Sequence, residues 1–141
     1  MFNDWDIRLA NYIESVRDRG FDWTDFDCLR FANAAVIAQR GEGFADDWLG
    51  ECKCGKSAFK HYMTMLKRQG YKTVPEAIDA RLTRSVGLMP RRGDIVGRHD
   101  LANSIVGLSL GVAISDLIAF VGHNGLVFSK PQPDDIYWSL S

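Results

Sequence analysis

The sequence predicts an α+β fold, with helices in the first part of the chain and a small antiparallel sheet in the last part. Apolar residues recur every three or four positions in three segments before residue 70. From residue 88 onward, short β-branched stretches alternate with glycines instead. At 141 residues the chain has the length of one domain. We therefore expect a single domain, helical over about 1–82 and sheet-forming over about 88–141.

The first helix is predicted over residues 2–16, where the apolar positions fall on one face, and it ends before Gly20. A third helix is predicted over 57–69 and ends at Gly70. A short fourth helix begins near Pro75, because proline is favoured at the first helical position. These helices have one apolar face each, which is typical of helices that cover a core.

The second helix, predicted over 28–39, is apolar on nearly all sides and is therefore expected to be the central buried one. Thr24, Asp25 or Asp27 can cap its N-terminus through a side-chain oxygen. Gly41 follows its last turn, which is the usual position for a glycine just beyond a helix.

The C-terminal part predicts four or five antiparallel strands joined by tight turns. Glycines recur through this region and separate the apolar stretches. The stretches that we expect to form strands are 95–96, 106–114, 117–121, 126–128 and 136–138.

The composition argues against several functions. With 17 Lys+Arg against 18 Asp+Glu, the net charge of −1 gives no general attraction to nucleic acid or to an anionic membrane. No apolar run reaches the roughly 18–20 residues of a membrane-spanning helix, and the acidic N-terminus does not resemble a signal peptide. We therefore expect no nucleic-acid partner, no membrane insertion, and a protein that stays in the cytoplasm or leaves the cell inside a larger assembly.

Cys28 is the main candidate for chemistry. It begins the predicted central helix, where unpaired backbone N–H groups and the positive end of the helix dipole favour a thiolate. A thiolate held in this way can act as a nucleophile when a base lies beside it. The alternative is a small buried apolar residue, because unbridged cysteine is among the most buried residue types.

Cys52 and Cys54 form the other pair of cysteines. A Cys-x-Cys spacing can supply two thiolate ligands to zinc or to an iron–sulfur cluster, but such sites usually take four ligands. Cys28 is the one further cysteine in the chain. We therefore expect no metal and no cofactor, and keep Cys52 and Cys54 as a weak alternative metal site.

Three short motifs occur in a fixed order along the chain. Asp27-Cys28 opens an apolar helix, Gly-Asp-Ile-Val at 93–96 starts the first core strand, and Ser-Leu-Gly-Val-Ala-Ile at 109–114 forms the next. Together they resemble the NlpC-type cell-wall peptidases of the papain-like cysteine peptidase superfamily, over about residues 20–128. The resemblance implies a papain-like fold with a thiolate nucleophile, a histidine base on the second core strand and a polar orienting residue on the third.

The chain departs from this pattern at the base. The resemblance places Ser109 at the histidine position and puts the orienting position near Val121. Serine does not accept a proton near neutral pH, and valine orients nothing, so this alignment lacks the standard triad. His123, on a predicted turn after the third core strand, is the candidate substitute base, with Asp27 flanking the nucleophile. We interpret His99 as a loop residue and His61 as a surface residue.

Two functions follow from the resemblance. Short NlpC-like domains with Asp-Cys and without the expected histidine resemble those that tailed phages encode among their tail-tip genes. The first interpretation is a phage tail or baseplate protein, carried in the virion, that contacts other tail proteins and peptidoglycan and is catalytically degenerate. The alternative is an active cysteine endopeptidase or amidase of the bacterial cell wall, with Cys28 as nucleophile and His123 as a non-standard base.

Overall fold

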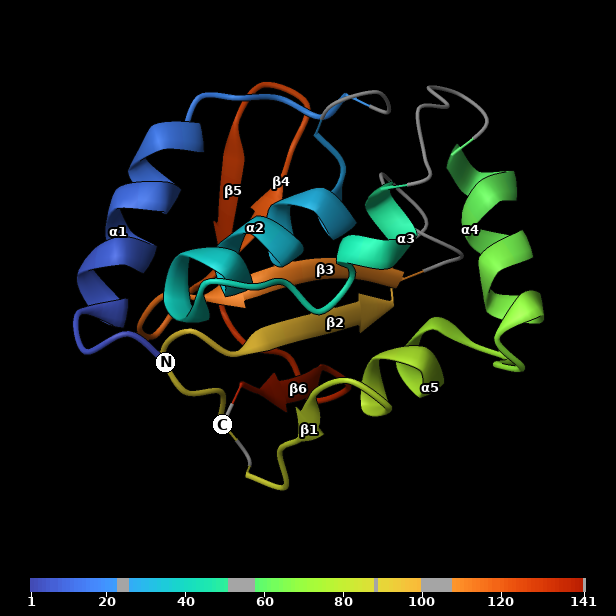
Figure 1. The fold of residues 1–141 in the computed structure, drawn as a ribbon. Helices are drawn as coiled ribbons and strands as arrows, with labels where there is room; N and C mark the ends of the chain where they lie inside the picture. Colours follow the sequence, from blue (N-terminus) through green and yellow to red (C-terminus); the bar gives the residue numbers. More distant parts are fainter. Residues whose placement is uncertain (23–25, 51–57, 88, 100–107, 141) are drawn as a thin grey trace.

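The computed structural model describes residues 1–22, 26–50, 58–87, 89–99 and 108–140 (Figure 1). Its elements confirm the predicted α+β order of N-terminal helices followed by an antiparallel sheet. The helices are α1 (Trp5–Val16), α2 (Cys28–Arg40), α3 (Asp46–Gly50), α4 (Ala58–Arg68) and α5 (Val74–Asp79). The strands are β1 (Thr83–Arg84), β2 (Ile95–His99), β3 (Leu108–Ala113), β4 (Ile118–Val121), β5 (Leu126–Ser129) and β6 (Ile136–Ser139).

The sheet has six strands in the order β1-β6-β2-β3-β4-β5, and each neighbouring pair is antiparallel. The sequence predicts only four or five strands, because β1 consists of two exposed residues that show no apolar pattern. Helix α3 was missed for a similar reason, since five residues are too short to reveal a helical period. The last strand, β6, therefore lies inside the sheet, between β1 and β2.

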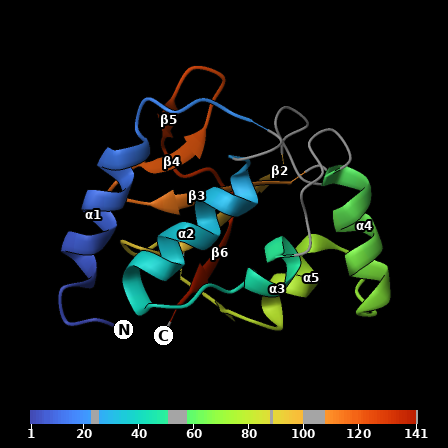
Figure 2. The ribbon, with the colours of Figure 1, turned by 45° about the horizontal axis from the view of Figure 1, so that its top comes forward.

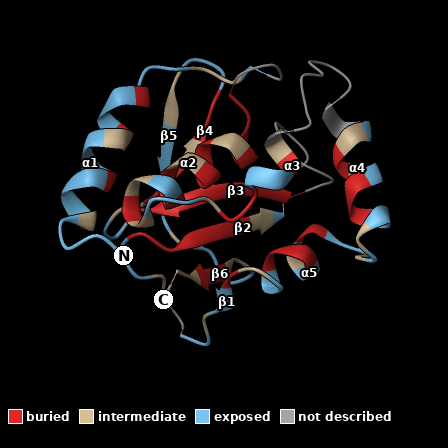
Figure 3. Cartoon of the chain, viewed as in Figure 1, coloured by how far each residue is buried: buried red, intermediate tan, exposed pale blue. Residues whose placement is uncertain are grey.

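Helix α2 is the central helix, as predicted, and packs against α1 on one side and against β3 and β4 on the other (Figure 2). Its most deeply buried residues form the main core together with one face of the sheet. The helix ends at Gly41, whose φ of 89° is the left-handed conformation that glycine adopts most readily. Figure 3 shows that β2 and β3 are buried along most of their length, whereas α1 exposes most of its surface.

Strand β3 is buried on both faces, and its two faces pack against different groups. Leu110 and Val112 belong to the main core that α2 covers. Side chains alternate along a strand, so Ser109 and Gly111 lie on the opposite face. A Cβ on Gly111 would lie 2.7 Å from the Phe120 ring, which shows how closely that face is packed.

No helix among the described residues has both the length and the apolar character needed to cross a membrane.

Candidate functional site

The N-terminus of α2 is capped by Asp27, one of the three residues predicted for that role. Its backbone is extended, with φ −103° and ψ 177°, and its Oδ1 accepts a hydrogen bond of 2.8 Å from the Arg30 backbone N–H. This bond satisfies one of the donors that a helix start leaves unpaired. The other two predicted caps, Thr24 and Asp25, lie outside the described residues.

The Asp27 carboxylate is completely buried, and an arginine and a tyrosine side chain bind it there. Its Oδ2 accepts hydrogen bonds from Arg30 Nη1 at 2.8 Å and from the Tyr62 hydroxyl at 2.7 Å. Arg30 Nη1 also lies 3.2 Å from the Tyr62 hydroxyl oxygen, so the three groups form a closed triangle. A buried charge needs such partners, because an unpaired one would be strongly destabilising. The Asp27–Arg30–Tyr62 network therefore fixes the start of α2 against α4.

Cys28 follows the capping residue as the first residue of α2. It is only 2% exposed and belongs to the main core. Two effects on this thiol oppose each other: the helix N-terminus favours the thiolate, whereas removal from water favours the neutral thiol. The helix N-terminus thus favours a nucleophilic thiolate at Cys28, but the surrounding core closes the sulfur to a substrate in this conformation.

The sequence resemblance suggests that Ser109 lies on the side of the sheet that faces Cys28, but the structure places Leu108 and Leu110 on that side. Ser109 pairs with Arg98 in the sheet, on the face away from α2. Leu108 and Leu110, one position out of phase, share the main core with Cys28. Ser109 and Cys28 therefore project to opposite faces of the sheet. Val121 ends β4 and is buried in the main core, where it offers no polar atom.

The three histidines occupy three different settings. His123 is exposed in the turn between β4 and β5. His61 lies on α4, with its Nε2 3.1 Å from the Trp48 carbonyl oxygen and its ring edge-on to Tyr62. Neither residue has a described hydrogen bond to Cys28.

His99 differs from the loop residue that the sequence suggests, because it is the exposed last residue of β2. It pairs directly with Leu108 and so lies on the face of the sheet that α2 covers. In both Figures 1 and 2, α2 begins over the end of the sheet where β2 stops and β3 starts. Sequence reasoning missed this placement, because Gly97, Arg98 and His99 show no apolar pattern that would extend the strand beyond Val96.

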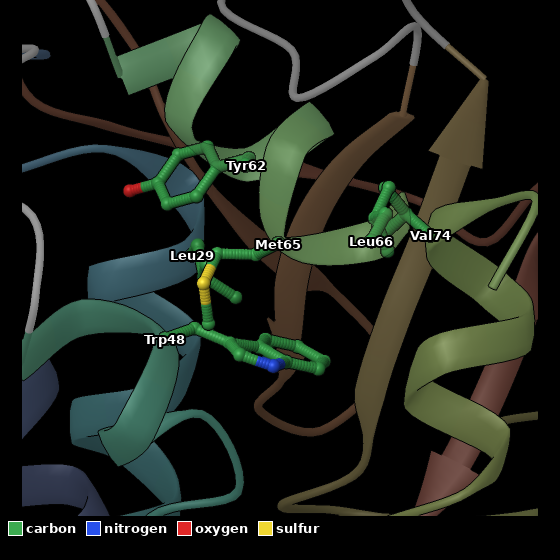
Figure 4. Close-up of a pocket in the computed structure, with 6 residues that line it drawn as sticks. All are labelled: Leu29, Trp48, Tyr62, Met65, Leu66 and Val74. Atoms are coloured by element: carbon green, nitrogen blue, oxygen red, sulfur yellow. The ribbon is translucent and has the colours of Figure 1, made fainter. Parts of the chain in front are cut away.

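An apolar pocket lies next to this network, between α2, α3, α4 and α5 (Figure 4). Its volume is about 20 Å³, which is close to the space that one water molecule needs. A pocket of this size is an imperfection in the packing and does not hold a substrate. Its lining residues are Leu29, Trp48, Tyr62, Met65, Leu66 and Val74.

The weak metal prediction concerns Cys52 and Cys54, which lie outside the described residues. Within the described ranges, no group of three or more His, Cys, Asp or Glu side chains is arranged to hold a metal ion.

The fold and this site define an α+β domain whose central helix begins at a buried, capped Asp-Cys pair and covers an antiparallel sheet. The chain belongs to the family described as a domain of unknown function (DUF6950), whose model matches residues 1–139. A search of curated proteins finds no match to the chain.

Proposed function

We propose that the protein is a papain-like, NlpC-type domain of a phage tail or baseplate that keeps the fold of a cell-wall cysteine peptidase without its catalysis. The observation that carries the proposal is the placement of α2, which starts at Asp27-Cys28 and packs across β3 and β4. A nucleophile-bearing helix followed by an antiparallel sheet is the arrangement that the sequence motifs imply.

The surroundings of Cys28 support a non-catalytic role. Its 2% exposure leaves no room for a peptide bond to reach the sulfur. A thiol also needs an oriented base to become an efficient nucleophile. Leu108 and Leu110, the β3 residues that share its core, have no titratable group, and Ser109 projects to the opposite face.

A second candidate function is an active cysteine hydrolase, and the position of His99 favours it. His99 lies on the face of the sheet that α2 covers, at the end of the sheet over which α2 begins. In that reaction the His99 imidazole would take the Cys28 thiol proton, and the thiolate would attack a peptide carbonyl carbon. The C–N bond would then break, and the amine would leave with the proton that His99 holds. Water, deprotonated by His99, would hydrolyse the resulting thioester to a carboxylate and restore the thiol. For this role His99 is better placed than His123, which lies in the turn beyond β4.

Peptidoglycan digestion separates the two candidates. Purified peptidoglycan would be incubated with the wild-type protein and with Cys28→Ala, His99→Ala and His123→Ala, and the release of soluble fragments and new amino groups would be followed. We expect no turnover by the wild type. Cleavage that Cys28→Ala and His99→Ala both abolish, with His123→Ala unaffected, would overturn the non-catalytic proposal and establish the hydrolase.

The tail association needs its own test, because it is independent of catalysis. Virions would be purified from the phage that carries the gene, and the protein would be sought in them by mass spectrometry and by immunogold labelling. We expect it at the tail tip. Its absence from intact particles would refute the tail proposal, whatever the digestion shows.

A further inference from the structure

A second cleft lies at the opposite end of α2 from Cys28. The two ends of the described chain, marked N and C in Figure 1, lie close to each other at this end of α2. Its volume is about 370 Å³, which is within the range of small-molecule sites. It lies between α1, the last turn of α2, the loop before β2 and the end of β6. The lining residues that matter here are Trp5, Gln39, Arg91, Arg92, Asp94 and Leu140.

Gln39 forms the floor of this cleft with an oxygen that has no donor. The side chain is 1% exposed, and its Nε2 donates to the carbonyl oxygens of Ala35 at 3.2 Å and Gly93 at 3.1 Å. Because both of these neighbours only accept, the amide must present Oε1 on its other side. No described residue donates to Oε1, and among the described residues no wholly buried side-chain N or O atom lacks a partner. Oε1 therefore faces the cleft as an acceptor.

The backbone of the loop before β2 is shaped around this amide. Gly93 has a φ of +91°, and a Cβ there would lie 2.3 Å from Gln39 Oε1 and 3.1 Å from the Trp5 ring. Only glycine lets the chain pass so close. The loop is held by the Arg91 N–H, which donates to Asp94 Oδ2 at 2.8 Å, and by the Asp94 N–H, which donates to the Arg91 carbonyl at 2.9 Å.

Two arginines supply positive charge at the same cleft. The side chains of Arg91 and Arg92 are exposed and, in the described part of the chain, form neither an ion pair nor a hydrogen bond. Arg30, Arg81 and Arg98, by contrast, each hold a carboxylate. Burial raises the pKa of the nearby Asp94 carboxyl, and the charge of Arg91 lowers that pKa by less. Two guanidinium groups that lie beside a cleft and form no hydrogen bond with the described residues are suited to a carboxylate or a phosphate group.

We propose that this cleft binds a small carboxylate with an amide N–H next to it, the chemistry of an N-acylated amino acid or of a peptide's C-terminal residue. The guanidinium groups of Arg91 and Arg92 bind the carboxylate, and Gln39 Oε1 accepts the N–H. The Trp5 ring and Leu140 contact the side chain of the ligand.

A phosphate group fits the same cleft less well. The doubly ionised group of a phosphate monoester only accepts hydrogen bonds, so it would leave Gln39 Oε1 without a donor. It would also bring a second negative charge towards the Asp94 carboxyl that lines the cleft. The amide N–H therefore distinguishes the expected ligand from a simple anion.

The test is a titration of the ¹⁵N-labelled full chain by NMR, with N-acetyl-DL-alanine as the probe. Acetate has the carboxylate without the N–H, the methyl ester of N-acetylalanine has the N–H without the charge, and inorganic phosphate is the competing anion. We expect N-acetylalanine to shift the Trp5 indole, the Gln39 side-chain amide and the Gly93 amide. We expect it to bind at least about tenfold more tightly than each of the other three.

Variants locate the site without disturbing the core. Arg91→Ala/Arg92→Ala should weaken N-acetylalanine binding by roughly tenfold or more, because it removes the charge-assisted hydrogen bonds. Arg17→Ala, which removes an exposed arginine directly after α1, is the control and should bind as the wild type does. The proposal is overturned if no cleft resonance shifts, if the ester or phosphate binds as tightly as N-acetylalanine, or if the double variant binds unchanged.

Discussion

Replacing Tyr62 by phenylalanine tests whether the buried network at the start of α2 stabilises the fold. The substitution keeps the ring, which packs between α2 and α4, and removes only the hydroxyl group. That hydroxyl donates at 2.7 Å to Oδ2 of Asp27, a carboxylate that is completely buried. Water cannot take its place without opening the core, so the carboxylate loses a partner.

The expected loss is set by the charge on the acceptor. A hydrogen bond to a charged group contributes about 1.5–3 kcal/mol, against about 1 kcal/mol for a neutral pair. Because Arg30 Nη1 remains bound to the same Oδ2 at 2.8 Å, we expect the lower part of that range, about 1.5–2 kcal/mol. For a chain of this length, this loss lowers the melting temperature by about 5–8 °C.

Urea denaturation followed by tryptophan fluorescence, together with thermal melts, would measure the loss. The matched control is Tyr12→Phe, because the Tyr12 hydroxyl donates to a neutral carbonyl, that of Phe31, at 3.4 Å. We expect this control to lose less than about 0.5 kcal/mol. Adding Asp27→Asn to Tyr62→Phe completes a double-mutant cycle, which should give a coupling of about 1 kcal/mol. Equal losses in the two tyrosine variants, or a coupling near zero, would refute the reasoning.

Three further predictions concern Cys28, the glycines and Asp94. Iodoacetamide should modify Cys28 slowly in the folded protein, where it is 2% exposed, and rapidly in urea; fast native labelling would contradict the non-catalytic proposal. Gly70→Ala places a Cβ at φ +83° in open space and should lower the free energy of unfolding by about 1 kcal/mol. Gly93→Ala places a Cβ at φ +91° against Gln39 and should lower it by at least about 3 kcal/mol. Equal losses in the two variants would show that the clash with Gln39 is absent. Burial raises the pKa of Asp94, so the folded state binds its proton more tightly and stability should fall as pH rises from about 4 through the folded-state pKa. Urea titrations at several pH values would measure the free energy of unfolding, and Asp94→Asn should make it depend less on pH. A wild-type stability that rises with pH through this window would contradict the prediction.

The long elements could be predicted from the sequence, because a repeated period of apolar residues leaves little choice of structure. The helix from Cys28, its cap at Asp27 and its end at Gly41 all follow from local chemistry. The short elements α3 and β1 could not be predicted, because neither spans a full period of its own pattern. Their positions depend on partners elsewhere, such as β6 for β1.

The candidate site was predicted only in part, because its geometry depends on residues that are distant in the sequence. Tyr62 reaches Asp27 from 35 residues away, and Gln39 meets Gly93 across 54 residues. No local pattern identifies such pairs. The position of Cys28 at a helix N-terminus predicts a reactive thiol, but the local sequence gives no sign that the core encloses the sulfur.

The place of β6 inside the sheet, between β1 and β2, constrains the order in which the chain can fold. Residues 136–138 pair with 95–97, so one edge of β2 stays without its partner until residues 136–138 have emerged from the ribosome. Strand β1 pairs only with β6 in the described sheet, so it too must wait for that strand. Non-local pairings of this kind slow folding. The helices and the strands β2–β5 can therefore associate first, whereas β6 and β1 join the sheet only after residues 136–139 are available.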